Sequence, residues 1–291
     1  MKIIDTLSSA VGRPQAIREI TSGTRLIGAV GRWRHQGAFF DLGEIDTIQL
    51  VFNVSGGQQV ELWRGNRSLC RVIRAGSVGI VFPGNPTRVR ISGTADTVQI
   101  IVSEQLVKAV SRRSDGLAPS NLALCDQHFQ AAAAQALVAL ASNRKDSRVA
   151  LERIVRQIVP WLKAIANRPT HGVAVGGLSP TARRRVHALV DERLQMSGCS
   201  PLAISELADA VDLSIHHFIK VFRQTEGKTP YACVIARRLN LALALLLQPH
   251  ARADWIAEQT GFSSPSHFVS TFRKHMGVTP GALRDAANTY R

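Results

Sequence analysis

Two short segments of this chain carry side chains suited to binding an anionic partner. On one helical face, the first segment would present imidazole, ammonium and guanidinium groups, and the second would present hydroxyl, imidazole and guanidinium groups. These residues are His216, His217, Lys220 and Arg223 in the first segment, and Ser266, His267, Ser270 and Arg273 in the second. Each can donate a hydrogen bond, and the cations attract negative charge. The chemistry indicated is binding, and no catalysis is needed.

The residues typical of metal and redox sites do not cluster along the sequence. Cys70, Cys125, Cys199 and Cys233 lie far apart and form no C-x-x-C pair, which argues against a zinc ribbon or a disulfide scaffold and fits a reducing compartment. On a helix, His216 and His217 would point about 100° apart with no third ligand near them. We therefore expect no metal, no cofactor and no catalytic residue.

Length and charge set broad limits on the class of protein. The chain has 291 residues, enough for about two domains, and a formal net charge of +15. That charge suggests nucleic acid, a membrane surface or an anionic small molecule as a partner. It is spread along the whole chain, and a GC-rich genome could also favour arginine, so it locates no site. Neither a signal peptide nor a membrane span is evident, and we expect a cytoplasmic protein.

The residues between 20 and 103 are typical of short strands separated by glycine-containing turns. The predicted strands are Thr47–Val54, Gln59–Trp63, Ser68–Ile73, Val78–Phe82, Arg88–Ile91 and Thr97–Val102, with a turn at Gly93 between the last two. Many short strands with regular turns favour a β-sandwich or barrel. Helical patterns follow at Ala131–Ala141 and Arg148–Ile165. A linker is predicted at 168–177, and Ser179-Pro180 should begin the next helix.

An internal repeat organises the C-terminal part. Leu207-Ala208-Asp209, Phe218-x-x-x-Phe222-Arg223 and Gly227-Lys228-Thr229-Pro230 recur as Ile256-Ala257-Glu258, Phe268-x-x-x-Phe272-Arg273 and Gly277-Val278-Thr279-Pro280. Each copy predicts a helix, a turn and a second helix, over about 203–224 and 251–274. Pro230–Gln248 lies between the copies and would span roughly 28 Å as a helix. Successive major grooves of DNA are about 34 Å apart, so such a connector could hold two recognition helices near that spacing.

These motifs resemble the DNA-binding domain of the AraC/XylS family of bacterial transcription regulators over about residues 178–285. The specific elements are Gly261-Phe262-Ser263, the paired phenylalanines with Arg273, Gly277-x-Thr279-Pro280, and the connector Arg238-Leu239-x-x-Ala242-x-x-Leu245-Leu246. The resemblance implies that each second helix enters a major groove. Base-contacting residues would be His216, Ile219, Lys220, Pro265, Ser266 and Ser270. Phosphate-contacting residues would be Ser214, Arg223, Ser264, His267, Arg273 and Lys274.

Two of these assignments have structural alternatives. Ile219 and the equivalent Val269 could instead be core residues. Members of the family often carry an arginine near Ser270, so the second copy of this chain could bind mainly phosphates. The basic triplet near the start of the domain also has two possible roles. Arg183-Arg184-Arg185 could contact phosphate or form a solvated face, and Trp255 is expected in the core.

The segment Gly76-Ser-Val-Gly-Ile-Val-Phe-Pro83-Gly84 is similar to the second conserved stretch of cupins, and on it the N-terminal half resembles the small cupin-like sensor domain of many such regulators. It lacks the clustered His and Glu of a metal cupin, since Thr87 and Arg88 stand where a His is expected. The strand arginines suggest an anionic effector, although outward charges on half-buried strands are the favoured explanation. They are Arg25, Arg32, Arg34, Arg64, Arg71, Arg88 and Arg90. Trp33 and Trp63 could line a pocket or fill the barrel.

The sequence thus predicts an α+β protein of two domains. Residues 1–110 form a cupin-like effector-sensing β-barrel, 111–177 a helical dimerisation segment and linker, and 178–291 an all-α domain with two helix–turn–helix motifs joined by a connector helix. The expected function is a homodimeric, effector-responsive regulator that binds double-stranded promoter DNA and activates or represses a neighbouring operon. As an activator it would also bind RNA polymerase. It would not be an enzyme or bind a membrane. The alternatives are a regulator controlled by a partner protein and a cupin enzyme fused to a DNA-binding domain.

Overall fold

The computed structural model describes most of the chain. The described residues are 12–41, 45, 47–56, 59–64, 67–82, 88–103, 106, 126–142, 146–166, 177–195, 202–248 and 251–289. The chain folds into two compact units, the first comprising Met1–Arg168 with Phe272–Arg291 and the second Pro169–Thr271. The C-terminal segment therefore packs with the N-terminal half of the chain.

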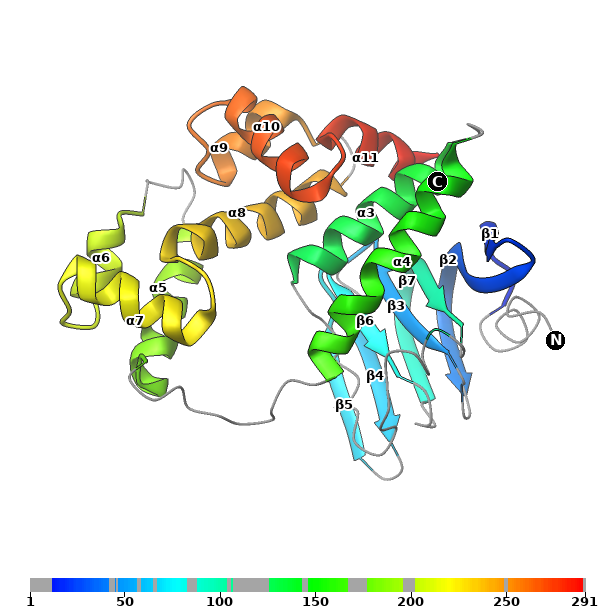
Figure 1. Cartoon of the computed structure of the whole chain (residues 1–291), viewed down its shortest axis with the longest axis horizontal. Helices are drawn as coiled ribbons and strands as arrows, with labels where there is room; N and C mark the ends of the chain where they lie inside the picture. The colour runs from blue at the N-terminus through cyan, green and yellow to red at the C-terminus, as the bar shows by residue number, and fades with distance from the viewer. Residues whose placement is uncertain are drawn as a thin grey trace. The chain divides into compact units, whose positions relative to one another are not determined.

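An antiparallel sheet forms the centre of the first unit (Figure 1). Its strands in the described residues are β1 (Ala16–Ser22), β2 (Arg25–Asp41), β3 (Ile48–Asn53), β4 (Gln59–Arg64), β5 (Arg67–Val72), β6 (Val78–Val81) and β7 (Arg88–Val102). Hydrogen bonds connect them in the order β1-β2-β7-β3-β6, while β4 pairs with β7 and β5. The long strands β2 and β7 pair along most of their length and hold the other strands together.

The turn predicted at Gly93 is wrong, because β7 runs without interruption through that position. Gly93 has a φ of 87°, and Gly37 in the paired strand has a φ of 54°. The pairing of β2 with β7 shifts between Gln36 and Ala38. Glycine adopts positive φ without a steric penalty, so here the two glycines accommodate an irregularity in the ladder instead of reversing the chain.

The central strands are buried on both faces of the sheet. One face carries Val30 and Ile100 and is covered by the helices α3 (Gln127–Ala141) and α4 (Ser147–Ala166). A Cβ added to Gly28 on this face would lie 3.4 Å from Val155 of α4. The opposite face buries a cluster of Ala29, Trp33 and Ile101. Because successive strand residues point to opposite faces, β2 and β7 each contribute to both layers.

Helix α11 (Pro280–Asn288) belongs to the first unit, where it packs against α3. Thr279 begins it by accepting a hydrogen bond from the backbone amide of Ala282, and Pro280 fits the first turn. Leu283, Ala286 and Ala287 are buried. This helix was not among the elements predicted from the sequence, although Thr279-Pro280 repeats the start of the predicted connector.

Helices make up the described part of the second unit. They are α5 (Pro180–Gln195), α6 (Ile204–Asp209), α7 (Ile215–Glu226), α8 (Pro230–Leu246) and α9 (Ala253–Gln259); α10 (Pro265–Met276) starts in this unit and ends in the first. The helices predicted to begin at Pro180 and Pro230 are confirmed. The core joins Val186 and Val190 of α5 to Leu207, Phe218 and Phe222. In the described residues, no helix combines the length and apolar character needed to cross a membrane.

Candidate nucleic-acid interface

Helix α7 has one buried face and one exposed polar face. Ser214 caps its first turn, with its hydroxyl oxygen accepting from the backbone amide of His217 at 3.4 Å. Phe218 and Phe222 face the core with ring centroids 5.4 Å apart. Gly227 ends the helix with a φ of 69°. The apolar anchors are spaced four residues apart and Val221 is buried beside them, so Ile219, Lys220 and Arg223 lie on the side open to solvent.

Helix α10 repeats this construction. The hydroxyl oxygen of Ser264 accepts from the backbone amide of His267 at 3.1 Å. Phe268 and Phe272 are fully buried, and the Phe268 ring lies 5.5 Å from that of Phe262. The His267 ring contacts the Ser263 hydroxyl at 2.9 Å. The repeated cap and phenylalanine pair thus fix the same polar face of α10 toward solvent.

Tight turns with matching backbone paths precede the two helices. In the first, the amide of Leu213 donates to the carbonyl oxygen of Ala208 at 3.1 Å. In the second, the amide of Phe262 donates to the carbonyl oxygen of Ala257 at 2.9 Å. Both turns contain a residue with left-handed backbone, and the sequence offset of 49 between the copies aligns these positions. The repeat seen in the sequence therefore extends to the local geometry.

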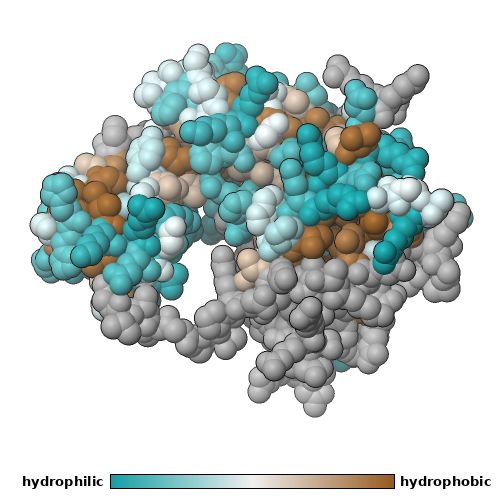
Figure 2. Space-filling view, in the orientation of Figure 1, coloured by the Kyte–Doolittle hydropathy of each residue, from teal (hydrophilic) through white to brown (hydrophobic). Residues whose placement is uncertain are grey.

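All six residues proposed to contact bases lie at the surface. His216, Ile219 and Lys220 are exposed on α7, and Pro265, Ser266 and Ser270 are exposed on α10. Ile219 retains 36% exposure and so is not a core residue, whereas Val269 is partly buried. Figure 2 shows hydrophobic residues among hydrophilic ones over the α6–α7 pair, and Ile215 and Ile219 are exposed hydrophobics of α7.

The residues proposed to contact phosphates flank these positions. Ser214, Arg223, Ser264, Arg273 and Lys274 are exposed, and His267 is partly buried. Three basic residues, Arg273, Lys274 and His275, lie in the last turn of α10. The free amides at the start of a helix can also donate to phosphate oxygens. Each helix therefore places possible phosphate donors at both ends of its exposed face.

An ionic cluster between helices was not anticipated from the sequence. His187 of α5 contacts the Glu226 carboxylate through Nε2 at 2.9 Å, and Nε of Arg183 donates to the same oxygen at 2.6 Å. Hydrogen bonding of the ring with Cys233 and Glu226 raises the pKa of His187 to about 9. Hydrogen bonding to His187 lowers the pKa of Glu226 to about 2. Helix α5 is thereby tied to the end of α7, and Arg183 is engaged in this ion pair.

The structure corrects the expectation for Trp255 and shows which strand arginines face outward. Trp255 is 41% exposed on α9, because the buried face of that short helix is formed by Ile256 and Ala257 instead. Among the strand arginines, Arg25, Arg34, Arg88 and Arg90 are exposed, but Arg32 is fully buried and paired with Asp96. The side chains of Arg64 and Arg71, and the whole of Thr87, lie outside what the structure describes. Within the described residues, no group of three or more His, Cys, Asp or Glu could hold a metal ion.

Comparison with known proteins identifies the C-terminal region. Residues 207–286 match the family described as "Helix-turn-helix domain". The RCS-specific HTH-type transcriptional activator RclR of Escherichia coli (strain K12) is 31% identical over 108 residues, which are 37% of this chain and 38% of that relative. The Xylose operon regulatory protein of the same strain is 26% identical over 130 residues, 45% of this chain and 31% of that relative. The first relative is a transcriptional activator and the second an operon regulatory protein.

The match to a solved structure of ToxT from Vibrio cholerae covers 94% of this chain and 99% of that one, at 13% identity and a TM-score of 0.36. The chain spans well under half the length of the two curated relatives it matches. The matched segment includes both helix pairs, from Leu207 in α6 to Ala286 in α11. The C-terminal region of this chain is therefore a helix–turn–helix domain of the AraC type.

Proposed function

We propose that this chain is a sequence-specific DNA-binding transcription regulator with two helix–turn–helix motifs, α6–α7 and α9–α10, in a domain covering 178–291. The observation that carries the proposal is the matched pair of exposed polar faces on α7 and α10. Each is set by a serine cap and two buried phenylalanines. The similarity of residues 207–286 to helix–turn–helix regulators supports the same function.

The connector helix supports a two-site mode of binding. Helix α8 has 17 residues and so measures about 25 Å along its axis. In this proposal α7 reads bases through His216, Ile219 and Lys220, and α10 through Pro265, Ser266 and Ser270. The hydroxyl of Ser270 donates to the carbonyl oxygen of His267 in its own helix at 3.1 Å. Base reading by α10 would therefore use the serine as an acceptor or require that bond to be exchanged.

The test is to find the bound DNA and measure what the two faces contribute. Genome-wide binding of the full chain would give a target sequence, and fluorescence anisotropy on that duplex would give affinity at several salt concentrations. Arg18→Ala is the matched control, because Arg18 is exposed on β1, away from both faces in sequence. The proposal fails if the folded protein prefers no genomic sequence over random DNA. Contact with RNA polymerase would follow only for an activator, and action on DNA would place the protein in the cytoplasm.

We further propose that the N-terminal region, 1–110, is a cupin-like barrel that senses a small molecule. The face of the sheet opposite α3 and α4 carries Thr97 and Gln99, which are 4% and 6% exposed. Thr97 Oγ1 and Gln99 Oε1 have no hydrogen-bond partner among the described residues. Buried polar atoms without partners are costly. The Gln99 oxygen can only accept, so a ligand that donates a hydrogen bond to it would relieve that cost, whereas the Thr97 hydroxyl can accept or donate.

This arrangement favours a hydrogen-bond donor as the effector over the anion suggested by the arginines. The one arginine that is buried among the described strand arginines, Arg32, is already paired with Asp96. A metabolite handled by the products of the regulated operon should raise the melting temperature of the full chain, and Gln99→Leu should abolish that shift. If no such compound shifts the melting temperature, control by a partner protein becomes the better explanation.

A homodimer through the helical segment 111–177 is part of the proposed function. Nine residues of α3 are buried, and this helix packs against the sheet, α4 and α11. Helix α4 retains an exposed side that includes Val149 at 69% exposure. We therefore place the proposed dimer contact on α4. Sedimentation of the full chain and of Val149→Glu would test this, with a shift toward monomer expected for the variant.

A further inference from the structure

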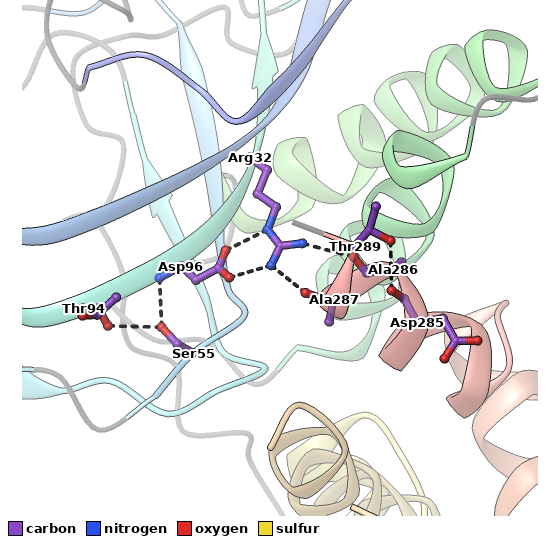
Figure 3. Close-up of polar contacts among 8 residues, drawn as sticks. All are labelled: Arg32, Ser55, Thr94, Asp96, Asp285, Ala286, Ala287 and Thr289. Atoms are coloured by element: carbon purple, nitrogen blue, oxygen red, sulfur yellow. Dashed lines mark hydrogen bonds and ion pairs between the residues drawn. The ribbon is translucent and has the colours of Figure 1, made fainter. Parts of the chain in front are cut away.

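A buried arginine in the sheet binds the end of the last helix. In Figure 3, Nε of Arg32 donates to Asp96 Oδ1 at 2.9 Å and Nη2 donates to Asp96 Oδ2 at 2.5 Å. Its Nη1 donates to the carbonyl oxygen of Ala286 at 3.1 Å, and Nη2 donates to that of Ala287 at 2.7 Å. Arg32 is fully buried and Asp96 is 5% exposed. The guanidinium thus joins a strand carboxylate to two carbonyl groups of α11.

This geometry satisfies groups that are otherwise costly to bury. The last turn of a helix has carbonyl groups without intrahelical partners, and the helix dipole makes that end negative. A guanidinium is the side chain that can donate to several acceptors at once, and Asp96 compensates its charge. Buried ion pairs contribute little net stability compared with apolar residues, but they demand a specific geometry. The pair is therefore suited to fixing the position of α11.

A second contact holds the other end of the α10–α11 segment. Gln135 of α3 donates through Nε2 to the carbonyl oxygen of Met276 at 3.2 Å. Gly277, which follows, has a φ of 74°, and an added Cβ would lie 2.5 Å from the Gln135 side chain. Phe272 and Met276 in the last turn of α10 are fully buried. The last turn of α10 is thus held in the first unit together with α11.

We propose that Arg32 and Asp96 form a latch that docks α11 onto the sheet and so positions the second DNA-reading helix. The proposal rests on the proposed function of α10. The latch holds α10 through its C-terminal end, while Pro265, Ser266 and Ser270 remain exposed at its start and middle. Recognition helices contact bases mainly through their N-terminal residues. Docking is therefore compatible with DNA binding. A helix that is already held in place loses less conformational freedom when it binds, so release of α11 weakens binding at the site read by α10.

The first experiment replaces the pair by apolar residues in the full chain, as Arg32→Met with Asp96→Leu. Removing both charges leaves no uncompensated charge in the sheet. Hydrogen exchange without DNA should show the α11 amides exchanging at least tenfold faster, while β2 and β7 keep their protection. DNA altered only in the α7 half-site binds through α10, and the affinity of the double variant for it should fall about fivefold to tenfold. DNA altered only in the α10 half-site binds through α7, and the affinity for it should stay within twofold. Arg18→Met, an exposed arginine of β1, is the matched control and should change neither quantity.

A second variant acts from the helix side and leaves the buried pair intact. Ala287 is 1% exposed next to Arg32, so Ala287→Arg would place a second guanidinium there and expel the end of α11. The same gain in α11 exchange is expected. Unchanged exchange of the α11 amides in Ala287→Arg overturns the latch. This test still decides the question if the double variant loses protection throughout the sheet. Failure of the wild-type chain to bind DNA would overturn the proposed function and not the docking, which exchange measures without DNA.

Discussion

Asp212 and Gly261 hold the same left-handed position in two equivalent turns. Their φ angles are 56° and 71°, and each residue lies between a short helix and a longer one. Glycine adopts this backbone freely, whereas other residues pay a steric penalty that is smaller for Asp than for most. Asp212 is the one non-glycine residue with positive φ in the described part of the chain.

We therefore predict opposite effects of exchanging these residue types. Asp212→Gly should raise the free energy of unfolding by up to about 1 kcal/mol, and Gly261→Ala should lower it by about 1–2 kcal/mol. Denaturant unfolding monitored by circular dichroism would measure both. A stabilising Gly261→Ala would contradict the argument from backbone strain.

The stability of the second unit should depend on pH through His187 and Glu226. The folded pKa of His187 is raised to about 9 from an ordinary 6.5. Its stabilising contribution is therefore complete below pH 6.5 and is lost as pH rises to 9. The folded pKa of Glu226 is lowered to about 2, so its contribution is present above pH 4.5 and is lost as pH falls toward 2.

His187→Gln isolates the alkaline half of this dependence. The wild-type chain should lose about 1–2 kcal/mol relative to the variant between pH 6.5 and 9, after allowance for solvent screening. Thermal or denaturant unfolding at several pH values would show that the free energies of unfolding of the wild type and the variant converge as the pH rises. A constant difference across this range would mean that the ring is not protonated in the folded state.

Lys220 and Arg273 should affect DNA binding in different ways. Lys220→Ala should cost about 1–3 kcal/mol on the preferred sequence and relax the base preference in one half-site. Arg273→Ala should weaken binding evenly on all sequences and reduce the salt slope by about 1. Anisotropy titrations with point-substituted duplexes would separate the two. An equal loss on all DNA for both variants would contradict base reading by α7.

The two threonine caps provide a matched pair of stability tests. Thr229 and Thr279 each accept from a backbone amide three residues later at 3.2 Å, at the starts of α8 and α11. Thr229→Ala and Thr279→Ala should each cost about 1 kcal/mol. Hydrogen exchange should place the first loss in α8 and the second in α11. Exchange that rises in both helices for either variant would show that the caps are not local.

Local signals in the sequence predicted the helices better than the sheet. Ser179-Pro180 and Thr229-Pro230 place hydroxyl caps before a first-turn proline, and α5 and α8 begin there. The strand pattern instead suggested a break at Gly93, because glycine is equally typical of turns and of irregular strands. The exposure of Ile219 on α7 also depended on packing, which the spacing of apolar residues alone left open.

Contacts between distant residues were beyond the reach of these patterns. Arg32 and Asp96 are 64 residues apart, and only the register of β2 with β7 brings them together. An arginine in an alternating strand pattern is ordinarily exposed, so its burial could not be read from the sequence. The cluster of His187, Glu226 and Cys233 had one weak signal, the helical spacing that places Arg183 and His187 on the same side of α5.

In the paired strands β2 and β7, neighbouring residues point to opposite faces of the sheet. Arg32 faces α11, while Trp33 faces the other side of the sheet, and Asp96 and Thr97 divide in the same way. A single peptide bond thus separates the groups that bind α11 from those on the face where we propose that a small molecule binds. A displacement of either strand would therefore act directly on both faces of the sheet.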